Sequence, residues 1–372
     1  MEFTIDRETI LEGVQKTLGI VERKTTLPNL NNVLVRAERG RIKLMATDRE
    51  IGLVTQYDAD VSFEGDITLS ARKFSEMLRE LQGKQILFRK LENNQVLITS
   101  EKVVYRISGI PADDFPLVVF DETMRMDSVK ARMLKDMIRK VHFAVSTDDL
   151  RKNLNGVFLE TEQAEGALQF RMVATDGHRL AKACAVVEQS DFLNLERGVI
   201  VPRKGLGEIR KLLEAESGDV GVAVGSGMFM IRTNDTLLKV SLVDAEYPDY
   251  RRVIPSEPGR RVQFDRETVL HAFRRMGVMA NERYNGVIIR ITGDRMVLNS
   301  QNPDVGEASD EIEVKYGGED LEVGYNVHYL IDALEAVEEK EVTFDIGVGM
   351  KPGVMRPVGN DLYFCIIMPL KL

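Results

Sequence analysis

The sequence has few cysteines, no long apolar segment and no leader pattern. Only Cys184 and Cys365 occur among 372 residues, far apart and without the spacing of metal ligands, so we expect two reduced thiols in a cytoplasmic protein and no metal site. No run approaches the roughly 20 apolar residues that a membrane-spanning helix needs. Residues 1–6 contain no basic segment followed by an apolar run, which argues against a signal peptide.

An excess of positive charge is also missing. The chain has 50 basic and 59 acidic residues, which gives a formal net charge of −9. Neutralising phosphates needs positive charge, so this balance argues against a protein that binds nucleic acid over its whole surface. The net charge excludes only a surface that is basic on average, because a protein can be acidic outside and basic on one inner face.

The common catalytic and cofactor motifs are absent from the sequence. There is no Walker loop, no Gly-x-Ser-x-Gly and no dinucleotide fingerprint, and the glycines at 225–227 and 347–349 fit hairpin turns instead. None of the histidines lies in a His-Glu-x-x-His pattern; they are His142, His178, His271 and His328. We therefore expect no cofactor and no catalytic metal.

The composition is that of an ordinary globular protein, organised around residues 174–181. Hydrophobic residues make up 44% and charged residues 29% of the chain. At a length of 372 residues, we expect two or three domains that each bury a core. Near the middle of the chain, an apolar run stops at Thr-Asp-Gly, which suits a tight turn, and resumes at Leu180. This turn displays His178 and Arg179 at the end of a strand.

The same pattern occurs three times. Related turns lie at 46–48 and 300–304, offset by 128 (174−46) and 126 (300−174) residues. The letters Asp-Arg-Glu-Thr at 6–9 recur at 265–268, and we expect Asp6 to be a helix N-cap. Because these matches recur in the same order at similar offsets, they indicate three copies of one domain-sized repeat.

Each third is predicted to contain the same elements in the same order. A strand and a first helix are followed by a strand carrying an Asn, at 31–35, 155–159 and 285–289, and by a strand that runs into the turn, which in the last third covers 296–299. Second helices are predicted at 71–81, 204–215 and 327–337, and closing strands within 86–110, 221–243 and 341–368.

Two helices and several antiparallel strands per third make an α+β domain with its helices on one face of the sheet. Phe115-Pro116 and Tyr247-Pro248 favour extended linkers. We therefore predict three domains, at 1–125, 126–252 and 253–372. Their edge strands should pair with a neighbouring domain or chain, and a curved array closed by a second copy of the chain would be a ring.

Several separate motifs occur in a specific order along the full length of the chain, at 26–30, 71–74, 155–156, 174–181, 200–205, 247–255, 281–284, 325–327 and 368–372. In these segments the chain resembles the bacterial β sliding clamp family, the processivity subunit of the replicative DNA polymerase III holoenzyme. The family implies three similar domains per chain and a homodimer, closed head to tail into a ring around duplex DNA, with helices lining the lumen.

The resemblance implies a pocket between domains 2 and 3 that binds short linear motifs. Its partners would be the replicative polymerase catalytic subunit, the clamp loader, other polymerases, ligase and mismatch-repair proteins. The residues that match the family's pocket are Arg151, Leu154, Thr175, Gly177, His178, Arg179, Leu180, Pro248, Arg252, Val253, Tyr329, Met350, Ile366, Ile367, Met368, Pro369 and Leu370.

The resemblance also implies a DNA-binding surface and a dimer interface. DNA contacts of the family, and basic residues at the start of the repeated helices, place the DNA-binding candidates at Lys24, Arg72, Lys152, Asn153, Arg203 and Lys204. Because the lumen would track phosphates, binding should not read sequence. At the dimer interface, Val278 and Met279 should pack near Tyr105 and Ile107 of the other chain.

Two other hypotheses fit parts of the pattern. An enzyme could use Asp176 and His178 as an acid/base pair, with Arg179 holding an anion, but it would not explain three whole-domain repeats. A repeat scaffold that does not bind DNA is the second alternative. Topological capture of circular DNA distinguishes the scaffold from a clamp.

Overall fold

The computed structural model describes residues 1–22, 28–116, 118–121, 123–164, 166–188, 192–193, 195, 197–281 and 283–371. The chain divides into two compact units. Unit 1 comprises Met1–Arg132 and Gly207–Leu242, and unit 2 comprises Met133–Leu206 and Val243–Leu372. Two helices, α3 (Ala131–Val141) and α4 (Arg203–Glu214), run from one unit into the other.

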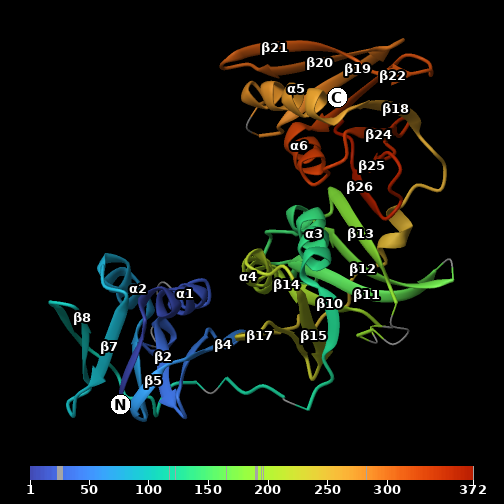
Figure 1. The fold of residues 1–372 in the computed structure, drawn as a ribbon. Coiled ribbons are helices and arrows are strands. Elements are labelled where there is room, and N and C mark those ends of the chain that lie inside the picture. The colour runs from blue at the N-terminus through green and yellow to red at the C-terminus, as the bar shows by residue number, and fades with distance from the viewer. Residues whose placement is uncertain are drawn as a thin grey trace. The chain divides into compact units, whose positions relative to one another are not determined.

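Unit 1 contains two antiparallel sheets and the helices α1 (Arg7–Thr17) and α2 (Ala71–Glu80). The short 3-10 turn η1 (Pro28–Asn31) lies between these helices in the chain. One sheet has the order β5-β1-β7-β8-β9, made of β5 (Asp60–Phe63), β1 (Glu2–Asp6), β7 (Gln85–Lys90), β8 (Gln95–Ser100) and β9 (Val103–Ser108). The other has the order β10-β15-β16-β17-β4-β3-β2-β6, made of β10 (Asp127–Lys130), β15 (Asp219–Gly225), β16 (Met228–Arg232), β17 (Thr236–Ser241), β4 (Ile51–Asp58), β3 (Arg41–Thr47), β2 (Asn32–Glu38) and β6 (Gly65–Ser70). The helix α1 contacts α2 and strands of both sheets, and this packing closes the core (Figure 1).

Unit 2 repeats this plan with α5 (Arg266–Val278) and α6 (Val327–Glu335) packed against each other. Its larger sheet has the order β14-β11-β12-β13-β26-β25-β24-β18-β22, made of β14 (Val199–Pro202), β11 (Gly156–Ala164), β12 (Ala167–Thr175), β13 (Arg179–Val187), β26 (Tyr363–Ile367), β25 (Gly353–Pro357), β24 (Glu341–Ile346), β18 (Arg260–Asp265) and β22 (Lys315–Tyr316). Its smaller sheet has the order β21-β20-β19-β23, made of β21 (Gly306–Glu313), β20 (Arg295–Asn302), β19 (Gly286–Thr292) and β23 (Leu321–Asn326). Three 3-10 turns connect these elements: η2 (His142–Ala144), η3 (Lys152–Leu154) and η4 (Tyr250–Val253).

The larger sheet of each unit joins strands of two successive repeats. In unit 1, β4 of the first third pairs antiparallel with β17 of the middle third. In unit 2, β13 of the middle third pairs antiparallel with β26 of the last third. The expectation that edge strands pair with a neighbouring repeat is confirmed at both junctions. The two compact units therefore cut across the predicted boundaries at 125 and 252, and those boundaries stay a prediction.

The predicted helices form, and the expected cap is present. The Asp6 side chain accepts hydrogen bonds from the backbone N–H groups of Glu8 and Thr9 at the start of α1. Asp265 accepts one from Thr268 at the start of α5, as the repeated letters would suggest. The second helices end one or two residues earlier than predicted. Among the described helices, none has the length and apolar character that a membrane crossing requires.

Several strand predictions were wrong in their bounds. Asn155 and Asn285 do not lie inside the strands predicted to carry them, because β11 begins after Asn155 and β19 after Asn285. Their carbonyls instead accept the N–H groups of Arg203 and Val327. The strand predicted at 296–299 continues to Asn302, because β20 stays paired with β21 up to the last pair, between Asn302 and Gly306. The third copy therefore turns later than the other two.

The cap at Asp265 can be tested by its pH dependence. Hydrogen bonds from the N–H and hydroxyl of Thr268 hold the pKa of this carboxyl below its ordinary value. A lowered folded-state pKa stabilises the protein above the unfolded pKa of about 3.9, and that stabilisation is lost as the pH falls through the folded pKa. We expect Asp265→Ala to lower the unfolding free energy by about 1 kcal/mol at pH 7. Asp265→Asn keeps the acceptor, so it should lose little at pH 7 and show a flatter loss in acid. Urea unfolding at pH 7 and at about pH 3, below the unfolded pKa, measures both. Equal stability of Asp265→Ala and the wild type at pH 7 would contradict the capping role.

Candidate partner-binding site at the β13–β26 junction

The central turn and the C-terminal segment lie together in unit 2. The pairing of β13 with β26 continues past the strand ends, where the backbone N–H of Met368 donates to the carbonyl of His178 at 2.9 Å. Pro369 is buried, and the N–H of Leu370 donates to the carbonyl of Gly324 at 2.8 Å. Segments 190 residues apart in the chain are therefore held side by side by backbone hydrogen bonds.

The turn at 175–178 is fixed by its own side chains. The carboxylate of Asp176 accepts the N–H groups of His178 and Arg179 at 2.9 and 3.0 Å, and the hydroxyl of Thr175 accepts the N–H of Gly177 at 3.1 Å. Gly177 has a φ of +90°, which side chains with a Cβ rarely adopt. The Thr-Asp-Gly sequence thus sets the turn geometry that places His178 outside.

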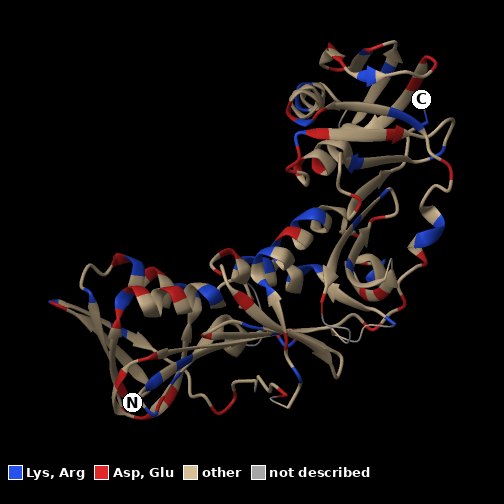
Figure 2. Cartoon of the chain, turned by 45° about the vertical axis from the view of Figure 1, so that its right-hand side comes forward, with Lys and Arg blue, Asp and Glu red and all other residues tan. Residues whose placement is uncertain are grey.

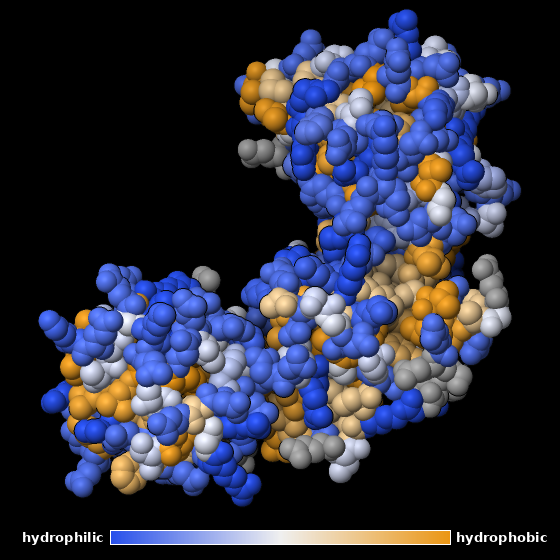
Figure 3. All heavy atoms as spheres, in the orientation of Figure 1, coloured by the Kyte–Doolittle hydropathy of each residue, from blue (hydrophilic) through white to orange (hydrophobic). Residues whose placement is uncertain are grey.

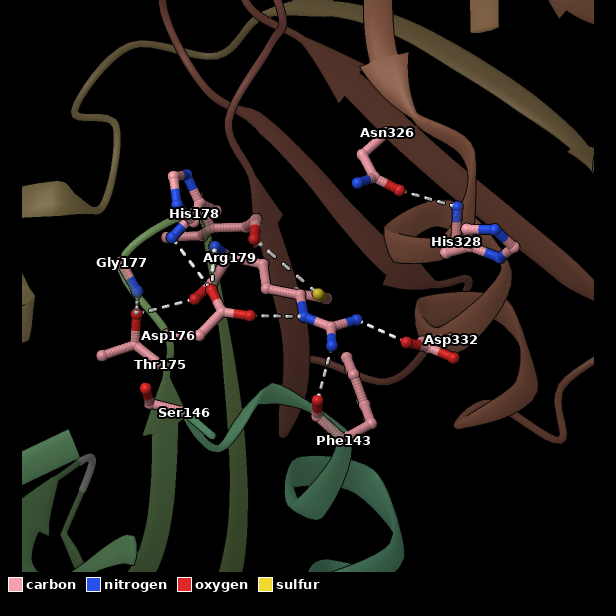
Figure 4. A network of polar contacts seen from close by, with 12 residues as sticks. Phe143, Ser146, Thr175, Asp176, Gly177, His178, Arg179, Asn326, His328 and Asp332 are labelled. Carbon is pink, nitrogen blue, oxygen red and sulfur yellow. Dashed lines mark hydrogen bonds and ion pairs between the residues drawn. The ribbon is translucent and has the colours of Figure 1, made fainter. Parts of the chain in front are cut away.

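The guanidinium of Arg179 lies between two carboxylates and does not face solvent. It bonds Asp176 at 3.0 Å, Asp332 on α6 at 2.5 Å and the carbonyl of Phe143 at 2.7 Å (Figure 4). It also lies 4.3 Å from the ring centroid of Tyr329, and only 11% of its side chain is exposed. Burial alone would lower the pKa of Arg179, but its bonds to the two carboxylates raise the pKa above its ordinary value. Arg179 therefore ties the turn to η2 and α6.

Strand alternation divides the predicted pocket residues between two faces of the larger sheet. Residues directly opposite each other in an antiparallel pair point to the same face. Leu180 pairs with Ile366, and Ile366 pairs with Val354, so these three side chains share one face. Arg179 pairs with Ile367, and both belong to the other face, where α6 and η2 contribute to the packing. Of the candidates on β13 and β26, Leu180 and Ile366 lie on the face away from α6, and Thr175 at the end of β12 pairs with Leu180 on that face.

A buried apolar cluster forms on that outer face. The η4 turn and the residues before it cover the sheet, with Tyr247 stacked on Phe158 at 4.8 Å between ring centroids. The hydroxyl of Tyr250 donates to Glu160 at 2.6 Å, which anchors η4. The buried members of the cluster are Leu154, Val173, Leu180, Ile200, Tyr247, Tyr250, Val354 and Ile366.

Apolar side chains remain exposed beside this cluster. Val253 at the end of η4 is 47% exposed, Met368 is 39% exposed and Met350 is 58% exposed. The ring of His178 is exposed and stacks on Tyr329 at 6.4 Å. Figure 3 shows hydrophobic side chains gathered over β12 and β13. A buried apolar floor with exposed apolar walls is a surface suited to apolar anchors of a partner.

Two arginines stand near this surface. Arg151 is exposed and donates to the carbonyl of Asp176 at 3.4 Å, next to the turn. Arg252 is exposed on η4 and pairs with Asp249 at 3.0 Å, and Pro248 is exposed beside it. These side chains can reach acidic or polar groups of a bound segment.

Several residues of the cluster were missed at the sequence level. Val354, Tyr250, Phe158 and Ile200 pack with Leu180 and Ile366, yet none was predicted to line the site. Residues 353–357 do not alternate between apolar and polar types, so no local pattern indicates that Val354 faces the site. No sequence signal shows that Tyr250 lies on the sheet, because this depends on the path of the linker.

The described DNA-binding candidates lie on α2, α4 and η3. Lys24 is outside the described residues. Arg72 is exposed on α2, Arg203 and Lys204 are exposed at the start of α4, and Lys152 is exposed on η3. Asn153, also on η3, is half-buried.

Positive charges on the helices are partly neutralised within the protein. Both acidic and basic residues occur along the helices (Figure 2). The ion pairs are Arg139 and Lys140 with Asp136, Arg274 with Glu335, and Arg275 with Asp310. By contrast, Lys130, Arg132 and Lys135 are exposed and form no ion pair among the residues that the structure describes. These three are the basic positions around α3 with charge available for a phosphate.

The candidates for the dimer interface lie at open sheet edges or beside them. Tyr105 and Ile107 lie on β9, the outermost strand of its sheet, where Val104 is 58% exposed. Val278, at the end of α5, is 80% exposed, and Met279 is half-buried. An exposed apolar residue beside an unpaired edge is a feature that protein–protein contact would cover.

The described residues provide no metal centre, and the central turn is not arranged as an acid/base pair. No group of three or more potential metal-binding side chains occurs in the described part of the chain. Both carboxylate oxygens of Asp176 bind backbone N–H groups and Arg179, so Asp176 does not orient the imidazole of His178. Cys184 and Cys365 are free thiols, and burial raises the pKa of Cys365 to about 12.

Three family models match along the chain. They describe the N-terminal, central and C-terminal domains of the DNA polymerase III beta subunit and match residues 1–119, 128–249 and 251–371. The chain is 34% identical to a beta sliding clamp of Pseudomonas aeruginosa and 30% identical to that of Escherichia coli K12, with 100% of both chains covered. Among solved structures, it is similar to a sliding clamp from Bartonella birtlesii bound to griselimycin (TM-score 0.94, 30% identity) and to the DNA polymerase III subunit beta from Pseudomonas aeruginosa (TM-score 0.92, 34% identity), again over 100% of each chain.

The tie made by Arg179 can be tested at the junction itself. Asp332→Asn removes one of the two carboxylates that hold its guanidinium. We expect the N–H of Met368, which bonds the turn, to exchange with solvent about five- to thirtyfold faster, corresponding to about 1–2 kcal/mol of local stability. Glu338→Gln is the matched control, because Glu338 is an exposed partner of Arg139 and should change exchange by less than about twofold. Hydrogen exchange by mass spectrometry or NMR measures both, and equal rates in the two variants would contradict the tie.

Proposed function

The chain belongs to the family of the DNA polymerase III beta subunit, the β sliding clamps, and we propose how its structure serves that function. It is a DNA sliding clamp, which confers processivity on DNA synthesis. It has three tandem domains of the clamp fold, for which we propose the ranges 1–125, 126–252 and 253–372. The observation that carries the mechanism is the repeated junction, in which the last strand of one repeat pairs with the first half of the preceding repeat.

The junction pattern supports closure of two chains into a head-to-tail ring. β4 pairs with β17, and β13 pairs with β26. In the last repeat, β21 has the position that β4 and β13 have in theirs, and in the first repeat, β9 has the position of β17 and β26. These two are sheet edges, so β21 of one chain would pair with β9 of its partner. Arg106 is exposed on β9, whereas Glu307 and Glu311 are exposed on β21. This charge complementarity favours the pairing of β9 with β21 over the pairing of either edge with itself. Tyr105, Ile107, Val278 and Met279 would be covered at this interface.

Inside the ring, the helices would face duplex DNA. Lys24, Arg72, Lys152, Asn153, Arg203 and Lys204 are the proposed DNA contacts, and the exposed side chains of Lys130, Arg132 and Lys135 add positive charge. Few contacts to phosphate suffice, because encirclement holds the DNA by topology while weak electrostatics allow sliding. The net charge of −9 is compatible with this, since only an inner surface needs to be basic.

The outer face of the β13–β26 junction would bind a short linear motif. The floor of Leu180, Ile366 and Val354 and the walls of Val253 and Met368 support this assignment. A buried aromatic anchor of about 150–250 Å² gains on the order of 4–6 kcal/mol before the cost of ordering the segment. With one aliphatic anchor in addition, we expect micromolar affinity per site. The other proposed lining residues are Arg151, Leu154, Thr175, Gly177, His178, Arg179, Pro248, Arg252, Tyr329, Met350, Ile367, Pro369 and Leu370.

The proposed partners follow from this role. They are the replicative polymerase catalytic subunit, the clamp loader, other polymerases, ligase and mismatch-repair proteins, all in the cytoplasm and close to the nucleoid. The protein would act without catalysis and without a cofactor, because the geometry of Asp176 and His178 does not support proton transfer between them. Two identical sites per ring would raise the residence time of partners that make two contacts.

Topological capture tests the clamp mechanism. Loaded on a nicked circular duplex, the protein should remain bound at a salt concentration that removes electrostatic binders, and it should leave when the circle is cut. The variant Val278→Glu/Met279→Glu should be monomeric at nanomolar concentration and should not be retained. Gel filtration of circular and linearised complexes measures all three results. Retention that is unchanged by cutting would show adhesion and would contradict encirclement.

The motif-binding site can be tested without disturbing the dimer. Deleting Met368–Leu372 should abolish binding of a polymerase C-terminal peptide, because it removes the exposed Met368 wall. Since this deletion also removes backbone hydrogen bonds, Val253→Glu is the milder variant and should weaken binding by about tenfold or more. Val358→Glu is its matched control, a 42% exposed valine after β25. Titration by fluorescence anisotropy, with native mass to verify the dimer, measures the effect, and wild-type affinity in both pocket variants would place the site elsewhere.

A further inference from the structure

A cavity of about 340 Å³ lies next to the apolar floor of the proposed motif site. Its lining includes Val354, which belongs to the floor, and five charged residues: Arg261, Lys351, Arg356, Asp345 and Glu257. None of these five charged residues was predicted to take part in partner binding. The cavity is therefore a distinct compartment that shares one wall with the apolar site.

The floor and the cavity form one row across the larger sheet. Successive opposite pairs link Leu180 to Ile366, Ile366 to Val354, Val354 to Asp345 and Asp345 to Arg261. Because opposite residues share a face, the five side chains stand in line on the outer face. The row is apolar on β13, β26 and β25 and becomes charged on β24 and β18.

The charged end of this row has an excess of positive charge. Asp345 is 4% exposed and binds two guanidinium groups, with Arg261 at 2.7 and 3.0 Å and Arg356 at 3.0 Å. One carboxylate thus neutralises only one of two arginines. Arg261 keeps 62% of its side chain exposed, so donors of its guanidinium can reach a further acceptor. The pKa of Arg261 is raised by its bond to Asp345, and the group stays charged.

A second row strengthens the cationic character of the same face. Phe364, on β26, lies 5.6 Å from the guanidinium of Arg356 and 5.5 Å from the ammonium of Lys182, measured to the ring centroid. Lys351, exposed at the cavity, pairs with the exposed Glu257 at 3.1 Å, an arrangement that solvent weakens. Arg356 on β25 and Arg261 on β18 therefore border the apolar floor on one side, and Lys182 lies on β13.

We propose that the Arg261–Arg356 cavity is an acidic-residue subsite of the motif site, which takes a carboxylate that the partner peptide carries outside its apolar anchors. This rests on the proposed function of the apolar floor. Arg261 lies two strands from Val354, about 10 Å at the usual strand spacing, and an extended peptide covers that span in about three residues. The subsite therefore selects peptides with Asp or Glu about two to four residues from the anchor that covers Val354. Bidentate binding by a guanidinium favours a carboxylate over a neutral amide.

A double-mutant cycle tests the subsite. The probes are synthetic fluorescent peptides with one aliphatic and one aromatic anchor, in which a single Asp is placed one to five residues from the anchors on either side, each matched by the Asn peptide. The full-length dimer is used as wild type, as Arg261→Gln and as Arg41→Gln. Arg41 is the control because it forms an exposed ion pair with Asp58 on another sheet and its substitution changes the net charge equally.

For one position of the Asp relative to the anchors, the wild type should bind the Asp peptide about three- to fivefold more tightly than the Asn peptide. Arg261→Gln should remove that preference and leave the affinity for the Asn peptide within about twofold of the wild-type value. Arg41→Gln should keep the preference for the Asp peptide. Equal affinity for Asp and Asn peptides at every position would overturn the subsite alone. If Arg261→Gln lowered the affinity for the Asp and Asn peptides equally, the effect would be structural, and this result would also overturn the subsite. Failure of the wild type to bind any anchor peptide would overturn the apolar site and the subsite with it.

Discussion

Backbone hydrogen bonding at sheet edges is the constraint on which the rest of the structure depends. A strand edge presents N–H and C=O groups that need a partner, and an open edge invites pairing with another strand. In this chain, the edge left by β4 is covered by β17, and the edge left by β13 is covered by β26. Each covering strand comes from the following repeat. The chain therefore joins successive repeats by continuous sheets and leaves β9 and β21 as the corresponding edges at its two ends.

The same junction determines what the site can do. Alternation along β13 sends the side chain of Arg179 to the face of α6 and the side chain of Leu180 to the outer face. The buried guanidinium, held by Asp176 and Asp332, fixes the turn and the helix together, while Leu180 and Ile366 form the floor on the other side. Of these two adjacent residues, Arg179 therefore holds the structure together and Leu180 contributes to the proposed binding surface. The row that begins at Leu180 ends at Arg261, which extends the proposed binding surface from apolar to cationic.

Much of the fold could be predicted from the sequence because the repeats reinforce one another. The letters Asp-Arg-Glu-Thr located two helix starts, and the cap at Asp6 is confirmed. Thr-Asp-Gly fixed the central turn through local hydrogen bonds, which sequence-level reasoning can anticipate. The end of β20 was wrong, since its length depends on pairing with β21, a partner that no local pattern identifies. The inward direction of Arg179 and the place of Tyr250 on the sheet depend on contacts between segments far apart in the chain, and the sequence alone does not determine these.

The central claim is that the edge strands β9 and β21 pair between two chains, in the way that β4 pairs with β17 and β13 pairs with β26 within one chain. Backbone amide exchange of β9 and β21 tests this most directly when it is followed while the protein is diluted through its dimer dissociation. The account predicts that both strands are protected in the dimer and lose protection together as monomers of 42.0 kDa appear, whereas β13 and β26 stay protected throughout. Fast exchange of β9 or β21 at concentrations where native mass shows only dimers would contradict it.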